Sequence, residues 1–238
     1  MLWSTGTLNS IERSLIDLPA ATLGVLALFF NHQWFACAFL LGGAALFKET
    51  SVLSFAVALG IKKGKRLDLK RIFVSVLIMV LPLALWVVYV QARMTAGSNV
   101  GTNQFAVPFS ALVHKLWKAP HDFAGVFLQG PVHPQAYDLF EILAPLSLVI
   151  QAAYLLVKPR FDDQAWRLGI GFALLLCVLG RNPWVAQNAY CRILLPLTFS
   201  FNLLLHKHEQ RTRLAAWYVA GNVGMCWKCL KYVKNFLF

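Results

Sequence analysis

The Lys48-Glu49 pair is the first place in the chain where neighbouring side chains could do chemistry. It lies between two apolar segments, Trp34–Phe47 and Ser51–Ile61. A charged pair in such a position is costly unless it lies at a surface, lines a polar cavity or has a partner. The pair therefore predicts an interface or a polar cavity at this point.

Other polar residues lie in or beside the earlier and later apolar segments, and we expect them on the same side as this pair. A lysine such as Lys48 and an arginine such as Arg192 can together hold a phosphate or diphosphate, because lysine supplies a point charge and arginine a bidentate fork. Arg181 lies near the same predicted side. The candidate substrate-binding residues are Lys48, Glu49, Asp17, Arg192 and Tyr190, and no catalytic residue is assigned.

Each of these residues also has a structural interpretation. Lys48-Glu49 can be an interfacial turn whose lysine reaches water. Arg192 can be paired with a helix carbonyl or a carboxylate, and Asp17, which precedes Pro19, suits the first turn of a helix. Both interpretations stay open on the sequence alone.

The motifs of soluble enzymes are missing from the sequence: we find no glycine-rich phosphate loop, no G-x-S-x-G elbow and no HExxH. His114, His121 and His133 lack metal-ligand spacing. We expect no cofactor; a divalent metal is compatible with the sequence but not indicated. Cys226 and Cys229 have the spacing of a redox motif or half a zinc site, yet no second pair accompanies them, so we expect packing cysteines.

The composition is that of a membrane protein. Hydrophobic residues make up 58% of the chain and charged residues 13%, whereas a soluble domain carries about 25% charge. Several apolar runs approach the roughly 20 residues that cross a bilayer. We expect an all-α polytopic transmembrane bundle with about seven to eight membrane helices, some of them short.

The positive charge is concentrated in short segments between apolar runs. The formal net charge is +12, and basic residues gather at 62–71, 158–167 and 207–213. Such loops orient a membrane protein with its basic side in the cytoplasm and contact anionic lipids. Membrane lipids are therefore the expected partners, and nucleic acid, which needs a basic face on a folded domain, is not.

We expect a single integral membrane domain over 1–238. Its parts are a short-helix region at 14–61 with the Lys48-Glu49 turn, a span at 72–91, an extracytoplasmic loop at 92–137 and C-terminal spans at 138–228. The first ten residues lack the basic and apolar regions of a cleavable signal peptide.

The short-helix region has two alternative arrangements. Two short helices can turn at Lys48–Ser51, or one long helix can cover Trp34–Ile61 with the charges near the middle of the membrane. We prefer the turn, because a lysine at the bilayer centre costs about 2.5–3.5 kcal/mol. The turn would place Lys48-Glu49 and Met1–Arg13 on the extracytoplasmic side, whereas the long helix would reverse the N-terminus.

Three short sequences carry a family resemblance. They are Ser14-Leu-Ile-Asp-Leu-Pro-Ala-Ala-Thr22, Phe47-Lys-Glu-Thr-Ser51 and Tyr190-Cys-Arg-Ile-Leu-Leu-Pro196. Together with the order of spans and loops, they resemble polytopic bacterial glycosyltransferases of the GT-C type over about residues 12–205.

The resemblance implies a polyprenyl-phosphate-linked sugar donor and a reaction on the extracytoplasmic face of the bacterial inner membrane. In relatives such as aminoarabinose transferases and protein O-mannosyltransferases, a lysine at the corresponding turn lies near the lipid phosphate, a role that falls here on Lys48. Those relatives carry a catalytic acid in a first outside loop, after an additional N-terminal span. We therefore expect this sequence to be an N-terminally truncated or inactive relative.

Overall fold

The computed structural model describes residues 16–30, 32–59, 68–93, 105–118, 136–185 and 189–226. Over these residues the protein is helical, apart from one isolated antiparallel bridge between Phe105 and Leu179. The predicted all-α fold class is confirmed. The elements are α2 (Asp17–Phe29), α3 (Trp34–Phe47), the 3-10 helix η1 (Glu49–Val57), α4 (Leu69–Arg93), a helix at 110–118, α6 (Ala136–Val157), α7 (Gln164–Val178), α8 (Arg181–Val185), α9 (Ala189–Ile193), α10 (Leu195–His208), α11 (Arg211–Asn222) and η2 (Val223–Met225).

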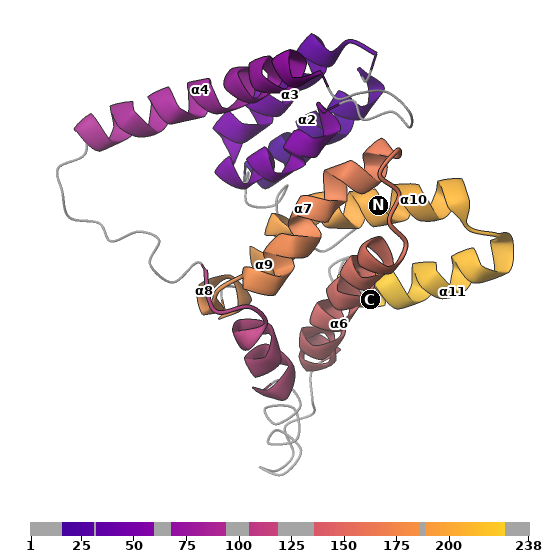
Figure 1. Ribbon diagram of the computed structural model, residues 1–238. Coiled ribbons are helices and arrows are strands. Elements are labelled where there is room, and N and C mark those ends of the chain that lie inside the picture. Colours follow the sequence, from indigo (N-terminus) through magenta and orange to yellow (C-terminus); the bar gives the residue numbers. More distant parts are fainter. Residues whose placement is uncertain are drawn as a thin grey trace, which may run out of the picture.

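The helices form two groups that meet at α7 (Figure 1). In the first group α3 packs between α2 and α4, and in the second α7 packs on α10 and α6, with α11 against α6. The element η1 joins the groups, because it packs on both α3 and α7, and α2 also touches α10. The candidate site lies where α2, α3 and α9 come together.

The helix α4 is the one described helix that is long and apolar enough to cross a membrane. It contains the span expected at 72–91, with Pro82 inside it. Only 11% of an apolar 18-residue stretch of α4 is buried. Figure 1 shows α4 extending away from the other helices at the upper left. Large apolar side chains cover its open surface, among them Phe73, Leu81, Leu85 and Trp86.

The helix is interrupted at Lys48, as the arrangement of two short helices with a turn at Lys48–Ser51 required. The helix α3 ends at Phe47, Lys48 is extended (φ −151°, ψ 118°), and η1 begins at Glu49. The long helix over Trp34–Ile61 is therefore not formed. What the sequence did not indicate is that η1 continues as a 3-10 helix for nine residues, although most 3-10 runs stop after three or four.

Small residues let the helices approach closely. A side chain at Gly171 of α7 would overlap with the Leu53 carbonyl oxygen of η1, and one at Gly169 with the Ser200 side chain of α10. Close backbone packing at small residues is typical of helix bundles in membranes, where apolar burial between helices adds little.

The largely apolar interior of the second group also holds a few hydrogen-bonded amides. Gln151 of α6 donates to the Gly221 carbonyl at 2.6 Å and accepts from the Thr198 hydroxyl at 3.0 Å. The amides of Asn202 and Asn222 bind each other reciprocally, with both N–O distances at 2.9 Å. These bonds join α6, α10 and α11, and they satisfy amide groups that are otherwise costly to bury.

The connections gather at two ends of the bundle, which we name by one residue each. The Asp17 end holds Asp17, the Lys48 turn, Arg192 and the Phe105–Leu179 bridge. The Asp163 end holds the connections that follow α6 and α10, where Lys207 and His208 bind Asp163 at 2.8 Å and Lys158 binds Glu209 at 2.5 Å.

Candidate functional site

The candidate site is built on Asp17, the first residue of α2. An acid in the first turn interacts favourably with the positive end of the helix dipole. Yet the carboxylate does not face water: 4% of the side chain is exposed. Both of its oxygens are bound by cations instead, one by each of two side chains from other parts of the chain.

Lys48 reaches the first oxygen from the break between α3 and η1. Its backbone N–H still closes the last turn of α3 by donating to the Ala44 carbonyl at 2.9 Å. The extended backbone then lets the side chain leave the helix, and its ammonium group donates to Asp17 Oδ1. With 19% of its side chain exposed, Lys48 lies at the edge of the interior.

Arg192 reaches the second oxygen from the short helix α9. Its Nη1 donates to Asp17 Oδ2 at 3.3 Å, and 18% of its side chain is exposed. Two cations thus share one acid, so the Asp17–Lys48–Arg192 cluster has a net charge of +1 if all three groups are ionised. A cluster with more positive than negative charge, partly open to its surroundings, can accept an anion such as a phosphate.

Glu49 and Tyr190, the other two candidate residues, take different positions. Glu49 is exposed at the start of η1, beside Lys48 in the chain, and makes no ion pair with another described residue. Tyr190 is 2% exposed, and its ring stacks on Trp184 with centroids 4.8 Å apart. The structure therefore places Tyr190 in the packing between α8 and α9, two residues before Arg192.

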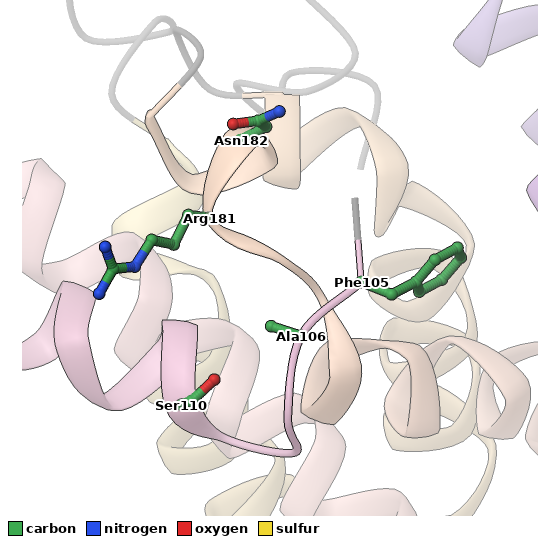
Figure 2. Close-up of a pocket in the computed structure, with 5 residues that line it drawn as sticks. All are labelled: Phe105, Ala106, Ser110, Arg181 and Asn182. Carbon is green, nitrogen blue, oxygen red and sulfur yellow. The ribbon is translucent and has the colours of Figure 1, made fainter. Parts of the chain in front are cut away.

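Arg181, which the sequence placed near the same site, lines a separate surface cavity of about 340 Å³. Figure 2 shows the Arg181 side chain extending over the helix at 110–118, with the Phe105 ring pointing to the other side. Ser110 and Asn182 add a hydroxyl and an amide to the lining. Sequence reasoning missed both residues; the turn-forming Asn182-Pro183 pair was the available signal.

The segment 105–109, beside this cavity, has an unusual backbone conformation. The Ala106 amide donates to Val178 O at 3.0 Å and the Phe109 amide to Cys177 O at 2.6 Å, so the segment before 110–118 is held on the end of α7. Phe109 adopts φ 64°, a left-handed conformation that bulky residues rarely take. Its N–H reaches Cys177 from that conformation.

The Asp163 end carries a second set of ion pairs, which stabilises connections between helices. Burial raises the pKa of Asp163, but hydrogen bonds from Lys207, His208 and the Ala165 amide outweigh it and hold this pKa below its usual value. The hydrogen bond from Lys158 lowers the pKa of Glu209, because its effect is larger than the opposing effect of burial.

The described cysteines lie in different surroundings, and none of them belongs to a group of metal ligands. Cys37 and Cys191 are buried, whereas Cys177 and Cys226 are partly exposed, and none of the four forms a disulfide with another described cysteine. Cys229 lies outside the described residues. Within the described ranges, no three His, Cys, Asp or Glu side chains come together as metal ligands.

Comparison with known proteins gives no relative: no family model, no curated protein and no solved structure matches this chain.

Proposed function

We propose that this chain is a multi-pass membrane protein of the bacterial inner membrane, with seven to eight membrane helices that include the short ones. The distribution of polarity supports this. Apolar side chains such as Phe73, Leu85 and Trp86 lie outside, while Gln151 and Asn202 are buried and hydrogen-bonded inside. Lipid accepts the former, and helices in lipid satisfy their polar groups internally.

We further propose that the Asp17–Lys48–Arg192 cluster binds the phosphate of a lipid-linked sugar, in the manner of the GT-C glycosyltransferases that the sequence resembles. The observation that carries the proposal is the sharing of the Asp17 carboxylate by two cations. Lys48 lies between α3 and η1 and Arg192 lies in α9, yet both bind the same carboxylate. A phosphate there would meet a point charge and a fork-shaped donor.

In glycosyl transfer the two cations would act on the leaving group. The acceptor oxygen forms a bond to the anomeric carbon while the bond from that carbon to the phosphate oxygen breaks. Lys48 and Arg192 stabilise the negative charge that develops on the departing phosphate, and a base takes the acceptor proton. Asp17 is unsuited as that base because both its oxygens are bound by cations. Glu49, which is exposed and follows Lys48 in the chain, is the better candidate.

The second candidate function is a non-enzymatic carrier or assembly subunit that binds a lipid-linked substrate without turnover. The engagement of Asp17 favours it, since binding a phosphate needs only the cations. Both candidates therefore predict phosphate binding, and they differ in whether sugar is transferred.

The test is binding of a short-chain polyprenyl phosphate by the full chain in lipid nanodiscs. We expect Lys48→Ala and Arg192→Ala to weaken binding at least about tenfold, a loss of about 1.4 kcal/mol. The matched controls are Lys70→Ala and Arg211→Ala, which remove exposed cations at other positions and should leave binding within about twofold. Unchanged binding by both cluster variants would overturn the assignment.

A second measurement separates the two functions. The same nanodiscs are given a polyprenyl-phosphate-linked sugar with a mixture of envelope acceptors, and release of free polyprenyl phosphate is followed. Release that depends on Lys48 and on Glu49 supports a transferase. Stoichiometric binding without release supports the carrier.

A further inference from the structure

A buried guanidinium group with unbonded N–H groups lies toward the Asp163 end of α7. Arg167 is 3% exposed, and its Nε and Nη1 have no hydrogen-bond partner in the described part of the chain. Asp163, one turn earlier, is hydrogen-bonded to Lys207 and His208, so Asp163 and the nearby Asp162 act on Arg167 through their charge and accept no hydrogen bond from its Nε or Nη1. An arginine held in this way is unfavourable unless an anion joins it.

A second arginine approaches the same region from α4. Arg71 and Arg167 both lie close enough to the Cys37 thiol to act on it electrostatically. Leu168, the residue after Arg167, packs in one cluster with Cys37 and with Met79, which lies two turns after Arg71. The starts of α3 and α4 are therefore adjacent, and Arg167 of α7 lies within electrostatic reach of the same Cys37 thiol.

The surroundings of Arg71 supply further donors. Its Nε and the hydroxyl of Ser75, one turn later and 1% exposed, are buried without hydrogen-bond partners among the described residues. The Arg71 guanidinium lies 5.7 Å from the centre of the Trp34 ring, at the start of α3. The N-terminus of α3 has no side-chain cap, so its first N–H groups and helix dipole also favour negative charge.

We propose that Arg167 and Arg71, with Ser75 and the N-terminus of α3, form a second binding site, for a phosphate group. Two guanidinium forks and a helix N-terminus are suited to phosphate oxygens. This phosphate belongs either to the headgroup of an anionic membrane lipid or to a soluble phosphate ester. The site is distinct from the Asp17–Lys48–Arg192 cluster and does not depend on the function proposed for it.

The experiment is thermal unfolding of the purified full chain in a neutral detergent, titrated separately with phosphatidylglycerol, glycerol phosphate and phosphatidylcholine. A ligand at about a hundred times its Kd raises Tm by roughly 5–10 °C in a chain of this size. We expect phosphatidylglycerol, glycerol phosphate or both to raise Tm, and phosphatidylcholine, which has no net charge, to do much less. A response to phosphatidylglycerol alone assigns the site to a lipid; a response to glycerol phosphate assigns it to the phosphate itself.

Variants of Arg167 and Arg71 test whether the anion binds at the proposed site. Arg167→Met should raise Tm without ligand, because it removes buried N–H groups that have no acceptor, and should remove at least about nine-tenths of the anion response. Arg71→Gln, at a partly exposed residue, should weaken the apparent affinity at least about threefold, and it serves if Arg167→Met does not fold. Arg211→Met, an exposed arginine, should respond as the wild type does. No response of the wild type to either anion, or equal responses of Arg71→Gln and the wild type, would overturn the proposal.

Discussion

Asp17 decides the charge of the candidate site, because it is the acid between two cations. Its negative charge stabilises Lys48 and Arg192 in the folded protein and competes with any incoming anion. These two effects have opposite signs in a binding experiment and in an unfolding experiment. A single substitution can therefore tell a binding site from an ion cluster with a structural role only.

We expect Asp17→Asn to raise the affinity for polyprenyl phosphate by about tenfold, because the two cations lose their competing acid. The same change should lower Tm, since a broken buried ion pair costs about 3–5 kcal/mol. Binding titrations and thermal unfolding on one preparation measure both. Asp162→Asn removes an exposed acid outside the cluster and should leave the affinity unchanged. For Asp17→Asn, a lower Tm with unchanged affinity would mean that the cluster only stabilises the fold.

At this scale the sequence indicated which residues are polar in an apolar setting, and the structure brings Asp17, Lys48 and Arg192 together. The sequence did not indicate that Tyr190 would stack on Trp184, or that Arg181 would line a separate surface cavity. Asp17 and Arg192 are 175 positions apart in the chain. Which side chains meet over such a separation depends on how the intervening helices pack, and no local pattern encodes that.

Among the elements, α7 is the helix around which the others are arranged, and its glycines determine how closely they approach. Gly171 faces the backbone of η1, whereas Gly43 of α3 has only a Leu23 methyl group, 3.7 Å from where its side chain would begin. The two glycines are therefore a matched pair, one in a tight contact and one in an open position.

We expect Gly171→Ala to destabilise the protein by about 1–3 kcal/mol, because the added methyl group overlaps with the Leu53 carbonyl and α7 must move away from η1. Gly43→Ala should be neutral or slightly stabilising, since alanine favours a helix over glycine by about 1 kcal/mol. Thermal unfolding in detergent compares them. Equal Tm values for the two variants would show that the contact between α7 and η1 is not tight.

The elements were predicted unevenly. The end of α3 at Phe47 followed from the position of Lys48-Glu49. Within the C-terminal spans expected at 138–228, the segment Ala189–His208 is divided into α9 and α10 around Leu194, and Pro196 at the start of α10 was the signal for this break. The 3-10 form of η1 had no such signal, because it depends on how η1 packs against α3 and α7.

For the whole molecule, the proposed membrane topology requires the Asp17 end and the Asp163 end to lie on opposite sides of the membrane. Single cysteines placed in a variant without the five natural ones can report it. We expect Asn182→Cys and Asp162→Cys, both at exposed residues of opposite ends, to react with an impermeant maleimide from opposite sides of sealed vesicles. Val87→Cys, exposed on α4, should react only after detergent is added. Labelling of all three from one side would contradict the multi-pass topology.

The ion pairs of the Asp163 end predict how stability depends on pH. Carboxyl groups whose pKa is lowered by folding stabilise the native state above their unfolded pKa, and this contribution is lost as the pH falls through their folded pKa. Asp163 and Glu209 both have lowered pKa values. We therefore expect Tm to fall as the pH is lowered below about 4–5.

The variant that tests this is Asp163→Asn with Glu209→Gln. It should have a Tm several degrees lower than that of the wild type at pH 7 and should lose less between pH 5 and pH 3, as thermal unfolding at about half-unit pH steps would measure. An identical pH profile for the variant and the wild type would mean that these two carboxyl groups contribute no pH-dependent stability.

The reciprocal amide pair of Asn202 and Asn222 has a consequence for how this chain can change over evolutionary time. Each amide is both donor and acceptor to the other, so replacing one strands a buried donor and a buried acceptor on the other. Replacing both with apolar residues of similar shape removes the penalty altogether. Descendants of this sequence should therefore keep both asparagines or lose both, and the two positions should mutate as one.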